Sequence, residues 1–99
     1  MTSLKIHPAA FDELIAAGQF YQAKRTGLGE DFLEQIQSGF YSIQERPEMW
    51  PEFIPGFRRL ILKRFPFAII YQLKEDYIEI IGIMHLNRQP GYWLDRTGG

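Results

Sequence analysis

The sequence predicts an α+β fold in which a helical hairpin packs on one face of a small, mainly antiparallel sheet. A short apolar–polar alternation near the N-terminus is followed by two segments with helical periodicity. Prolines then interrupt the chain at four-residue intervals, and runs rich in Ile, Leu, Tyr and Phe follow them. These observations give the element order βααβββ.

The first strand and the first helix are predicted by alternation and by a proline. Residues 4–7 alternate between apolar and polar side chains, and Pro8 supplies the fixed φ that suits the first position of a helix. We expect Asp12 and Glu13 in the first turn, where the helix dipole favours negative charge, and the end of the helix near Gly27. The expected apolar stripe consists of Phe11, Leu14, Ile15 and Gly18.

A second helix is predicted directly after a glycine-rich break at residues 27–29. Glu30 and Asp31 open it, and apolar residues then recur at helical spacing. This stripe consists of Phe32, Leu33, Ile36, Phe40 and Ile43. Because the link between the two helices is short, they should form an antiparallel hairpin.

The segment from Glu45 to Gly56 is predicted to be a loop, since each of its three prolines would remove a helical hydrogen bond. The loop and the residue after it carry a large apolar area on Met49, Trp50, Phe53 and Phe57. These side chains either fold back onto the helices or wait for a protein partner. Trp50, Phe53 and Phe57 are the candidate partner-binding residues.

Three antiparallel strands are predicted for the rest of the chain, over Arg58–Phe65, Phe67–Lys74 and Tyr77–His85. Pro66 belongs to the first turn, because it cannot donate to a strand ladder, and residues 75–76 form a tight second turn. The side chains expected to face the helices from the middle strand are Phe67, Ile69, Tyr71 and Leu73. The last strand is apolar on both faces, and we expect it to be central.

Strand alternation also predicts a cationic surface. Arg59, Lys63 and His85 should share the sheet face away from the helices, joined at one edge by Arg64, Arg88 and Tyr92. Such a surface could bind anions. The alternative is that these cations are ordinary solvated side chains and that His85 is a structural histidine.

Length and composition restrict the fold and location of the protein. The 99 residues suffice for one domain, expected over residues 1–96, with a flexible tail at residues 97–99. The absence of cysteine excludes disulfides and thiolate metal sites, and it fits a cytoplasmic location. No apolar stretch approaches the roughly 20 residues that would span a bilayer, so no membrane contact is expected.

Charge and missing motifs restrict the chemistry. A net charge of −1 provides no strong long-range attraction to nucleic acid. Phosphate-binding loops, the dinucleotide-binding glycine pattern and the serine-hydrolase elbow are absent from the sequence. His7 has no second histidine at ligand spacing. We therefore expect no cofactor, no metal and no small-molecule substrate.

Three segments carry a resemblance to a known family. They read F-R-R at residues 57–59, K-R-F-P-F-A-I-I-Y at residues 63–71 and H-L-N-R-Q-P-G-Y-W at residues 85–93. Together with the order βααβββ, they resemble the RelE/ParE superfamily of toxins from type II toxin–antitoxin modules. The H-x-x-R-x-P-x-Y-W pattern is most similar to ParE-like members.

The resemblance implies a toxin that a cognate antitoxin neutralises by wrapping the helices and the sheet, with DNA gyrase or the ribosome and mRNA as target. ParE-like relatives inhibit DNA gyrase without known hydrolysis, whereas RelE-like relatives cleave mRNA on the ribosome. The ParE-like interpretation is favoured, since a net charge of −1 departs from the basic balance of the RelE-like nucleases. A non-toxic interaction module on the same fold is the third possibility.

Each interpretation assigns roles to particular residues. Target binding would involve Arg59, Lys63, Arg64, Arg88, Tyr92 and Trp93. If the protein were an mRNA endonuclease, the catalytic candidates would be Lys63, Arg64, His85, Arg88 and Tyr92. For Trp93 the favoured alternative is a structural role, in which the indole clamps the C-terminal segment against the sheet edge.

Overall fold

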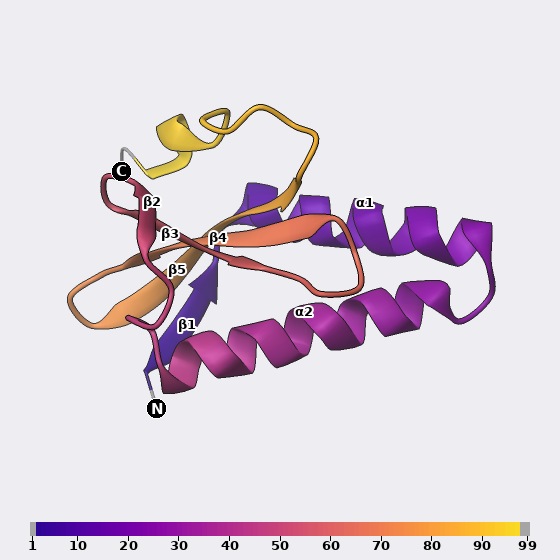
Figure 1. Cartoon of the computed structure of the whole chain (residues 1–99), viewed down its shortest axis with the longest axis horizontal. Helices are drawn as coiled ribbons and strands as arrows, with labels where there is room; N and C mark the ends of the chain where they lie inside the picture. The colour runs from indigo at the N-terminus through magenta and orange to yellow at the C-terminus, as the bar shows by residue number, and fades with distance from the viewer. Residues whose placement is uncertain (1, 98–99) are drawn as a thin grey trace.

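A computed structural model of the chain describes residues 2–97 and shows two helices on one face of a five-stranded mixed sheet (Figure 1). The helices are α1 (Pro8–Lys24) and α2 (Leu28–Glu45). The strands are β1 (Ser3–Ile6), β2 (Glu52–Ile54), β3 (Phe57–Ile61), β4 (Phe67–Leu73) and β5 (Tyr77–His85), and a short 3-10 helix, η1 (Leu94–Thr97), follows them. The predicted α+β class and helical hairpin are confirmed, with one strand more than expected.

The sheet has the order β1-β5-β4-β3-β2. Strands β3, β4 and β5 form the predicted antiparallel meander, whereas β1 pairs with β5 in parallel. The parallel ladder runs from Ser3, opposite Tyr77, to Ile6, opposite Ile80. Strand β5 therefore has a neighbouring strand on both sides over its first half, whereas β1 does not reach its second half.

Strand β2 corrects the prediction that residues 45–56 form a loop throughout. It pairs with β3 in antiparallel register through Glu52 and Ile54, opposite Arg58 and Phe57. The reversal uses Gly56 at φ 86°, whose N–H donates to the Glu52 carboxylate at 3.0 Å. This strand was not predicted because it has only three residues between Pro51 and Pro55, too few to show the alternation of apolar and polar side chains.

Strand β3 ends at Ile61, four residues earlier than the predicted end at Phe65. The connection to β4 is closed by two backbone hydrogen bonds, from Leu62 N–H to Phe67 O at 2.9 Å and from Phe67 N–H to Phe65 O at 2.8 Å. Lys63 and Arg64 therefore lie in a turn, and strand alternation does not determine where their side chains point.

Helix α1 is capped by His7, whose Nδ1 accepts a hydrogen bond from Ala9 N–H at 3.0 Å. The prediction that Asp12 and Glu13 lie in the first turn is wrong, because the helix begins at Pro8 and both carboxylates come one turn later. The predicted stripe is also partly wrong. Phe11 and Ile15 are 49% and 40% exposed, and the buried residues are Ala10, Leu14, Ala17 and Gly18.

The two helices approach each other closely at a pair of glycines. A Cβ atom on Gly29 would lie 2.6 Å from the carbonyl oxygen of Gly18, closer than atoms can pack. Gln22 of α1 completes the junction, since its Oε1 accepts from Gly27 N–H at 3.1 Å and from Gly29 N–H at 3.0 Å. A side chain of α1 therefore caps the first turn of α2.

The sheet is buried on both faces. Under the helices, a core forms around Phe32, Ile36, Ile69, Tyr71 and Ile80. The opposite face is covered by the C-terminal segment, drawn in yellow, which packs there on side chains of β2, β3, β4 and β5 (Figure 1). This second core contains Phe57, Ala68, Ile70, Ile81, Met84 and Trp93. The chain beyond β5 is therefore part of the fold, and of the predicted tail only Thr97 lies within the described residues, at the end of η1.

A β-bulge in β5 changes which residues face the helices. Ile70 of β4 pairs with Gly82 and Tyr71 pairs with Ile80, so Ile81 is an extra residue in the ladder. Beyond the bulge the alternation is inverted, and Met84 faces the C-terminal segment rather than the helices. Uninterrupted alternation along β5 would instead have placed Met84 on the same face as Ile80.

The bulge also corrects the expected position of His85. Its ring meets that of Phe67 edge to face, with centroids 5.0 Å apart, on the side of the sheet covered by the helices. The prediction that His85 shares the opposite face with Arg59 is wrong, because alternation counted through Ile81 is displaced by one residue.

We predict that Gly29→Ala lowers the free energy of unfolding by about 1–3 kcal/mol, because the added methyl group must separate the helices at a backbone contact. Gly18→Ala is the matched control. A Cβ on Gly18 meets only Leu33 side-chain atoms at 3.6 Å or more, and alanine is the better helix former. Urea denaturation of both variants measures the difference, and equal stabilities would contradict the contact.

Candidate functional site

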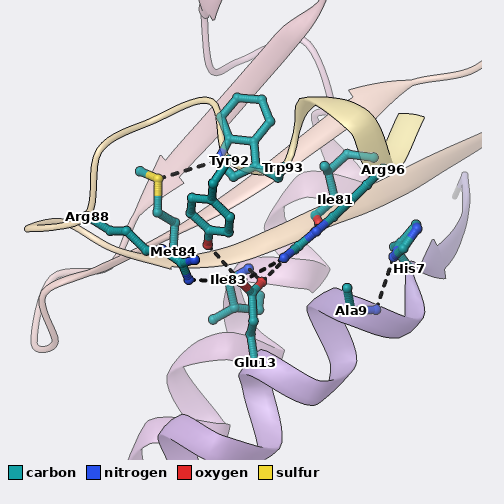
Figure 2. Close-up of polar contacts among 10 residues, drawn as sticks. All are labelled: His7, Ala9, Glu13, Ile81, Ile83, Met84, Arg88, Tyr92, Trp93 and Arg96. Carbon is teal, nitrogen blue, oxygen red and sulfur yellow. Dashed lines mark hydrogen bonds and ion pairs between the residues drawn. The ribbon is translucent and has the colours of Figure 1, made fainter. Parts of the chain in front are cut away.

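A cluster of hydrogen bonds and ion pairs surrounds the carboxylate of Glu13, on the second turn of α1 (Figure 2). Arg96 binds it with both guanidinium nitrogens, Nη1 to Oε1 at 2.9 Å and Nη2 to Oε2 at 3.1 Å. The Tyr92 hydroxyl donates to Oε2 at 2.8 Å, and Arg88 Nη1 lies 3.7 Å from the same oxygen. Three side chains of the C-terminal segment thus converge on one helix residue.

The same carboxylate completes the exposed edge of β5. Strand β1 ends at Ile6, opposite Ile80, so the later backbone groups of β5 have no strand on that side. Ile83 N–H donates to Glu13 Oε1 at 3.0 Å, and Ile81 O accepts from Arg96 Nη1 at 3.0 Å. The Glu13–Arg96 pair therefore takes the place of a neighbouring strand.

Arg88 is the exposed member of this cluster. Its guanidinium carbon lies 3.5 Å from the centroid of the Tyr92 ring, and the side chain is 57% exposed. The tyrosine ring and the Glu13 carboxylate fix its position while its outer face meets solvent. An ordered guanidinium of this kind is available to bind a carboxylate or a phosphate of another molecule.

The electrostatics keep Tyr92 protonated. Burial raises the pKa of the Tyr92 phenol well above its ordinary value of 10.0. The hydrogen bond to Glu13 and its charge raise this pKa further, and Arg88 and Arg96 only partly oppose the rise. The hydrogen bond to Glu13 likewise raises the pKa of Arg96. At neutral pH the cluster therefore holds a neutral phenol and a charged ion pair.

A pocket of about 340 Å³ lies beside this cluster, between α1 and the β4–β5 ladder. The space is open because Ala16 and Ala17 have small side chains. The aromatic rings of Phe20, Tyr21 and Phe67 line it, and its polar side is formed by His85 and Arg88. His85 Nδ1 accepts from Asn87 N–H at 3.0 Å, so a neutral His85 ring carries its proton on Nε2. The pocket thus combines aromatic walls with two possible hydrogen-bond donors.

Of the six residues of the predicted cationic surface, the structure brings together His85, Arg88 and Tyr92. The other three lie elsewhere. Arg59 stacks over the Phe53 ring at 4.6 Å, Arg64 lies 3.7 Å from Asp31 of α2, and Lys63 lines a separate hollow beside α2. The predicted single anion-binding surface is therefore wrong, because Lys63 and Arg64 lie in the turn after β3 and the bulge in β5 places His85 on the face opposite Arg59.

The aromatic candidates also separate. Trp93 is fully buried, donates from Nε1 to Met84 Sδ at 3.5 Å and packs on the Phe57 ring at 4.7 Å between centroids. The indole packs the C-terminal segment on the sheet, but it covers the face opposite the helices and not the predicted sheet edge. Phe57 is buried by the same contact, whereas Trp50 and Phe53 are partly exposed. Only the latter two present surface to a partner.

Within residues 2–97, no group of three or more His, Asp or Glu side chains is placed to hold a metal ion. None of the helices in this part of the chain has the length and apolar character that crossing a membrane requires.

Glu13 was not among the residues that sequence reasoning selected for function. Its partners are 70 to 83 positions away in the chain, so no local spacing connects them. The one available signal is a charged residue beside the buried Leu14, on a helix whose sheet-facing side is otherwise apolar or small. A carboxylate at such a position must find cationic partners.

No protein-family model matches the chain, and no curated protein sequence matches it. Among solved structures, it is similar to a chain from the chromosomal ParDE TA system of P. aeruginosa, with a TM-score of 0.73 and 27% sequence identity. The similarity covers 87% of this chain and 97% of the other. The fold is thus RelE/ParE-like. The similarity also confirms the resemblance to ParE-like toxins.

We predict that Glu13→Gln lowers the free energy of unfolding by about 2–3 kcal/mol, because the two arginines and Tyr92 lose a charged acceptor. The exposed neighbour Asp12 provides the control, since Asp12→Asn removes the same charge from the same helix. Chemical denaturation followed by Trp fluorescence measures both variants. If Glu13→Gln is as stable as Asp12→Asn, the carboxylate does not hold the C-terminal segment.

We also predict a pH effect from Tyr92. Because the phenol has a raised pKa in the folded protein, its contribution to stability is complete below pH 10 and is lost as the pH rises further. Tyr92→Phe should therefore show a smaller loss of unfolding free energy above pH 10 than the unmodified chain. Tyr41→Phe, at an exposed position, is the control. Parallel pH curves for Tyr92→Phe and the unmodified chain would contradict this assignment.

Proposed function

We propose that the protein is the toxin of a type II toxin–antitoxin module of the plasmid-stabilisation type, acting in the cytoplasm and neutralised by a cognate antitoxin. The observation that carries this proposal is the similarity, over nearly the whole of both chains, to a chain of a ParDE TA system. The proposed action is ParE-like: the toxin binds DNA gyrase as a protein target and stops growth without cutting a nucleic acid itself.

The arrangement of the candidate residues supports binding over mRNA cleavage. An endonuclease site needs cations and a proton-transferring group around one phosphate. Lys63 and Arg64 lie near α2, whereas Arg88 and Tyr92 lie at α1. The Tyr92 hydroxyl already donates to Glu13, and its raised pKa makes it a poor proton donor. The exposed guanidinium of Arg88 remains suited to contact an acidic group of a target protein.

Expression of the chain without an antitoxin, in a bacterial host that carries a DNA-damage reporter, tests the proposal. We expect growth arrest together with reporter induction, because stalled gyrase leaves broken DNA. Arrest with a silent reporter would contradict the gyrase target and favour the mRNA endonuclease. Normal growth at high expression would contradict toxicity and favour the interaction module.

The same assay tests Arg88. We expect Arg88→Ala to weaken growth arrest at least tenfold in inducer dose while changing stability by no more than about 1 kcal/mol, since the side chain is largely exposed. Arg25→Ala, at the exposed end of α1, is the matched control and should remain fully toxic. If both variants are equally toxic, Arg88 does not contact the target.

A further inference from the structure

The pocket beside α1 has an apolar interior and one polar end. Its volume of about 340 Å³ lies at the lower end of the range of small-ligand sites, roughly 300–1,000 Å³. Small and aromatic side chains of α1 form the interior together with Phe67 of β4 and Ile83 of β5. His85 and Arg88 form the polar end, and Glu13 is the one acidic residue among the described residues that line the pocket. A ligand that fills this space needs an apolar body and one polar group at its end.

Arg88 is available to bind that polar group, because the Glu13 carboxylate beside it already accepts four hydrogen bonds. Glu13 Oε1 accepts from Arg96 Nη1 at 2.9 Å and from Ile83 N–H at 3.0 Å. Glu13 Oε2 accepts from the Tyr92 hydroxyl at 2.8 Å and from Arg96 Nη2 at 3.1 Å. Arg88 Nη1 lies 3.7 Å from Oε2, beyond hydrogen-bond distance. Within residues 2–97 the Arg88 guanidinium therefore has no hydrogen-bond acceptor.

The charges at this end of the pocket favour an anion. One carboxylate, that of Glu13, lies between the two guanidiniums of Arg88 and Arg96. The paired bonds from Arg96 compensate the carboxylate, so the positive charge of Arg88 remains in excess. The Arg88 guanidinium carbon lies 3.5 Å from the centroid of the Tyr92 ring, and this stacking holds the cation in place before a ligand binds (Figure 2).

His85 provides a second donor at the same end of the pocket. Its Nδ1 accepts from Asn87 N–H at 3.0 Å, so the proton of a neutral ring is on Nε2. In the part of the chain that the structure describes, Nε2 has no hydrogen-bond partner. The ring meets that of Phe67 edge to face at 5.0 Å between centroids, which fixes its orientation. A carboxylate has two acceptor oxygens, one for each of the donors His85 and Arg88.

The walls favour a flat aromatic body. The rings of Phe20 and Tyr21 meet edge to face at 5.3 Å between centroids, and Tyr21 meets Phe67 in the same way at 6.2 Å. Phe20 is 55% exposed although it lines the pocket, so a ligand would remove apolar ring surface from water. Ala16 and Ala17 leave room beside these rings. Aromatic rings gain energy from edge-to-face and offset contacts beyond the burial of area, so these walls suit an aromatic ligand better than a saturated one.

We propose that this pocket binds a small free aromatic monocarboxylate, with the ring against the aromatic walls and the carboxylate at Arg88 and His85. The binding site does not rest on the proposed function, and a chain without toxicity would bind the acid equally. The site shares Arg88 with the proposed target contact. A bound acid would therefore occupy the guanidinium that an acidic group of the target needs.

The probe is 3-phenylpropionate, titrated into the isotope-labelled chain and followed by NMR. We expect the amide signals of Phe20, Phe67 and His85 to shift along one saturable curve with a Kd below about 1 mM, as for a small ligand with one charge-assisted contact. The neutral amide of the same acid should bind about tenfold more weakly, because Arg88 loses its charged acceptor. Absence of saturation, or equal binding of acid and amide, would overturn the proposal.

Two variants with matched controls locate the ligand. Arg88→Ala should weaken binding of the acid about tenfold, to the level of the amide, and leave the amide unaffected, whereas Arg25→Ala should change neither. Ala16→Leu fills the pocket from an exposed helix position and should weaken both ligands about tenfold. Ala23→Leu, on the same helix but outside the pocket, is its control. If Arg88→Ala binds the acid as the unmodified chain does, the carboxylate is not at Arg88 and the proposal fails.

Two further ligands test the class of the occupant. The acid 3-cyclohexylpropionate has the same charge and carbon count but is not flat, and it should bind about threefold more weakly. Equal or tighter binding of this acid would overturn the assignment of an aromatic body. The peptide acetyl-Gly-Gly-Phe with a free C-terminus presents the same ring and carboxylate at the end of a chain, and we expect it to bind no more tightly than 3-phenylpropionate. Tighter binding of the peptide would make a polypeptide terminus the occupant and overturn the assignment of a small acid.

Discussion

The carboxylate of Glu13 joins three parts of the molecule: helix α1, the free edge of β5 and the C-terminal segment. The constraint begins with β1, which is too short to cover β5 beyond Ile80. Backbone groups left at that edge need partners, and a carboxylate removed from water needs charge compensation. Glu13 and Arg96 meet both requirements together, since each binds the other and one backbone group of β5.

The C-terminal segment follows from this arrangement. Once Tyr92 and Arg96 are held at Glu13, Trp93 lies between them in the chain and must turn toward the sheet. There its indole completes the second core with Phe57 and Met84. Gly91, at φ 108°, provides the reversal that sets up this turn. The H-x-x-R-x-P-x-Y-W pattern at residues 85–93 therefore mainly holds the C-terminal segment in place, and Arg88 is its exposed charged member.

Elements whose pattern is local were predictable from the sequence. The helical hairpin and the meander follow from periodicities of 3.6 and 2 along continuous segments, and the break at residues 27–29 separates the helices. Strand β2 was not predictable, because it has three residues between two prolines and depends on Arg58 across the turn. The face of His85 was missed since one extra residue, Ile81, displaces all later positions.

The site was less predictable than the fold. The pattern at residues 85–93 correctly indicated that Arg88 and Tyr92 lie side by side. They are only four positions apart in the chain, and the guanidinium of Arg88 stacks on the Tyr92 ring. The acidic partner that holds them lies on the first helix, and no spacing in the sequence connects residues so far apart. Lys63 was expected on the same surface because strand alternation was extended past the end of β3, and His85 was expected beside Arg59 because alternation was extended through the bulge.

Hydrogen exchange at the Ile83 amide tests most directly whether Glu13 completes the sheet. If its N–H is bonded to the Glu13 carboxylate, the Ile83 amide should exchange about as slowly as the amides of β4, and Glu13→Gln should accelerate it more than any amide of α2. Rapid exchange at Ile83 in the unmodified chain would show that this edge is open and that the C-terminal segment is held by other contacts.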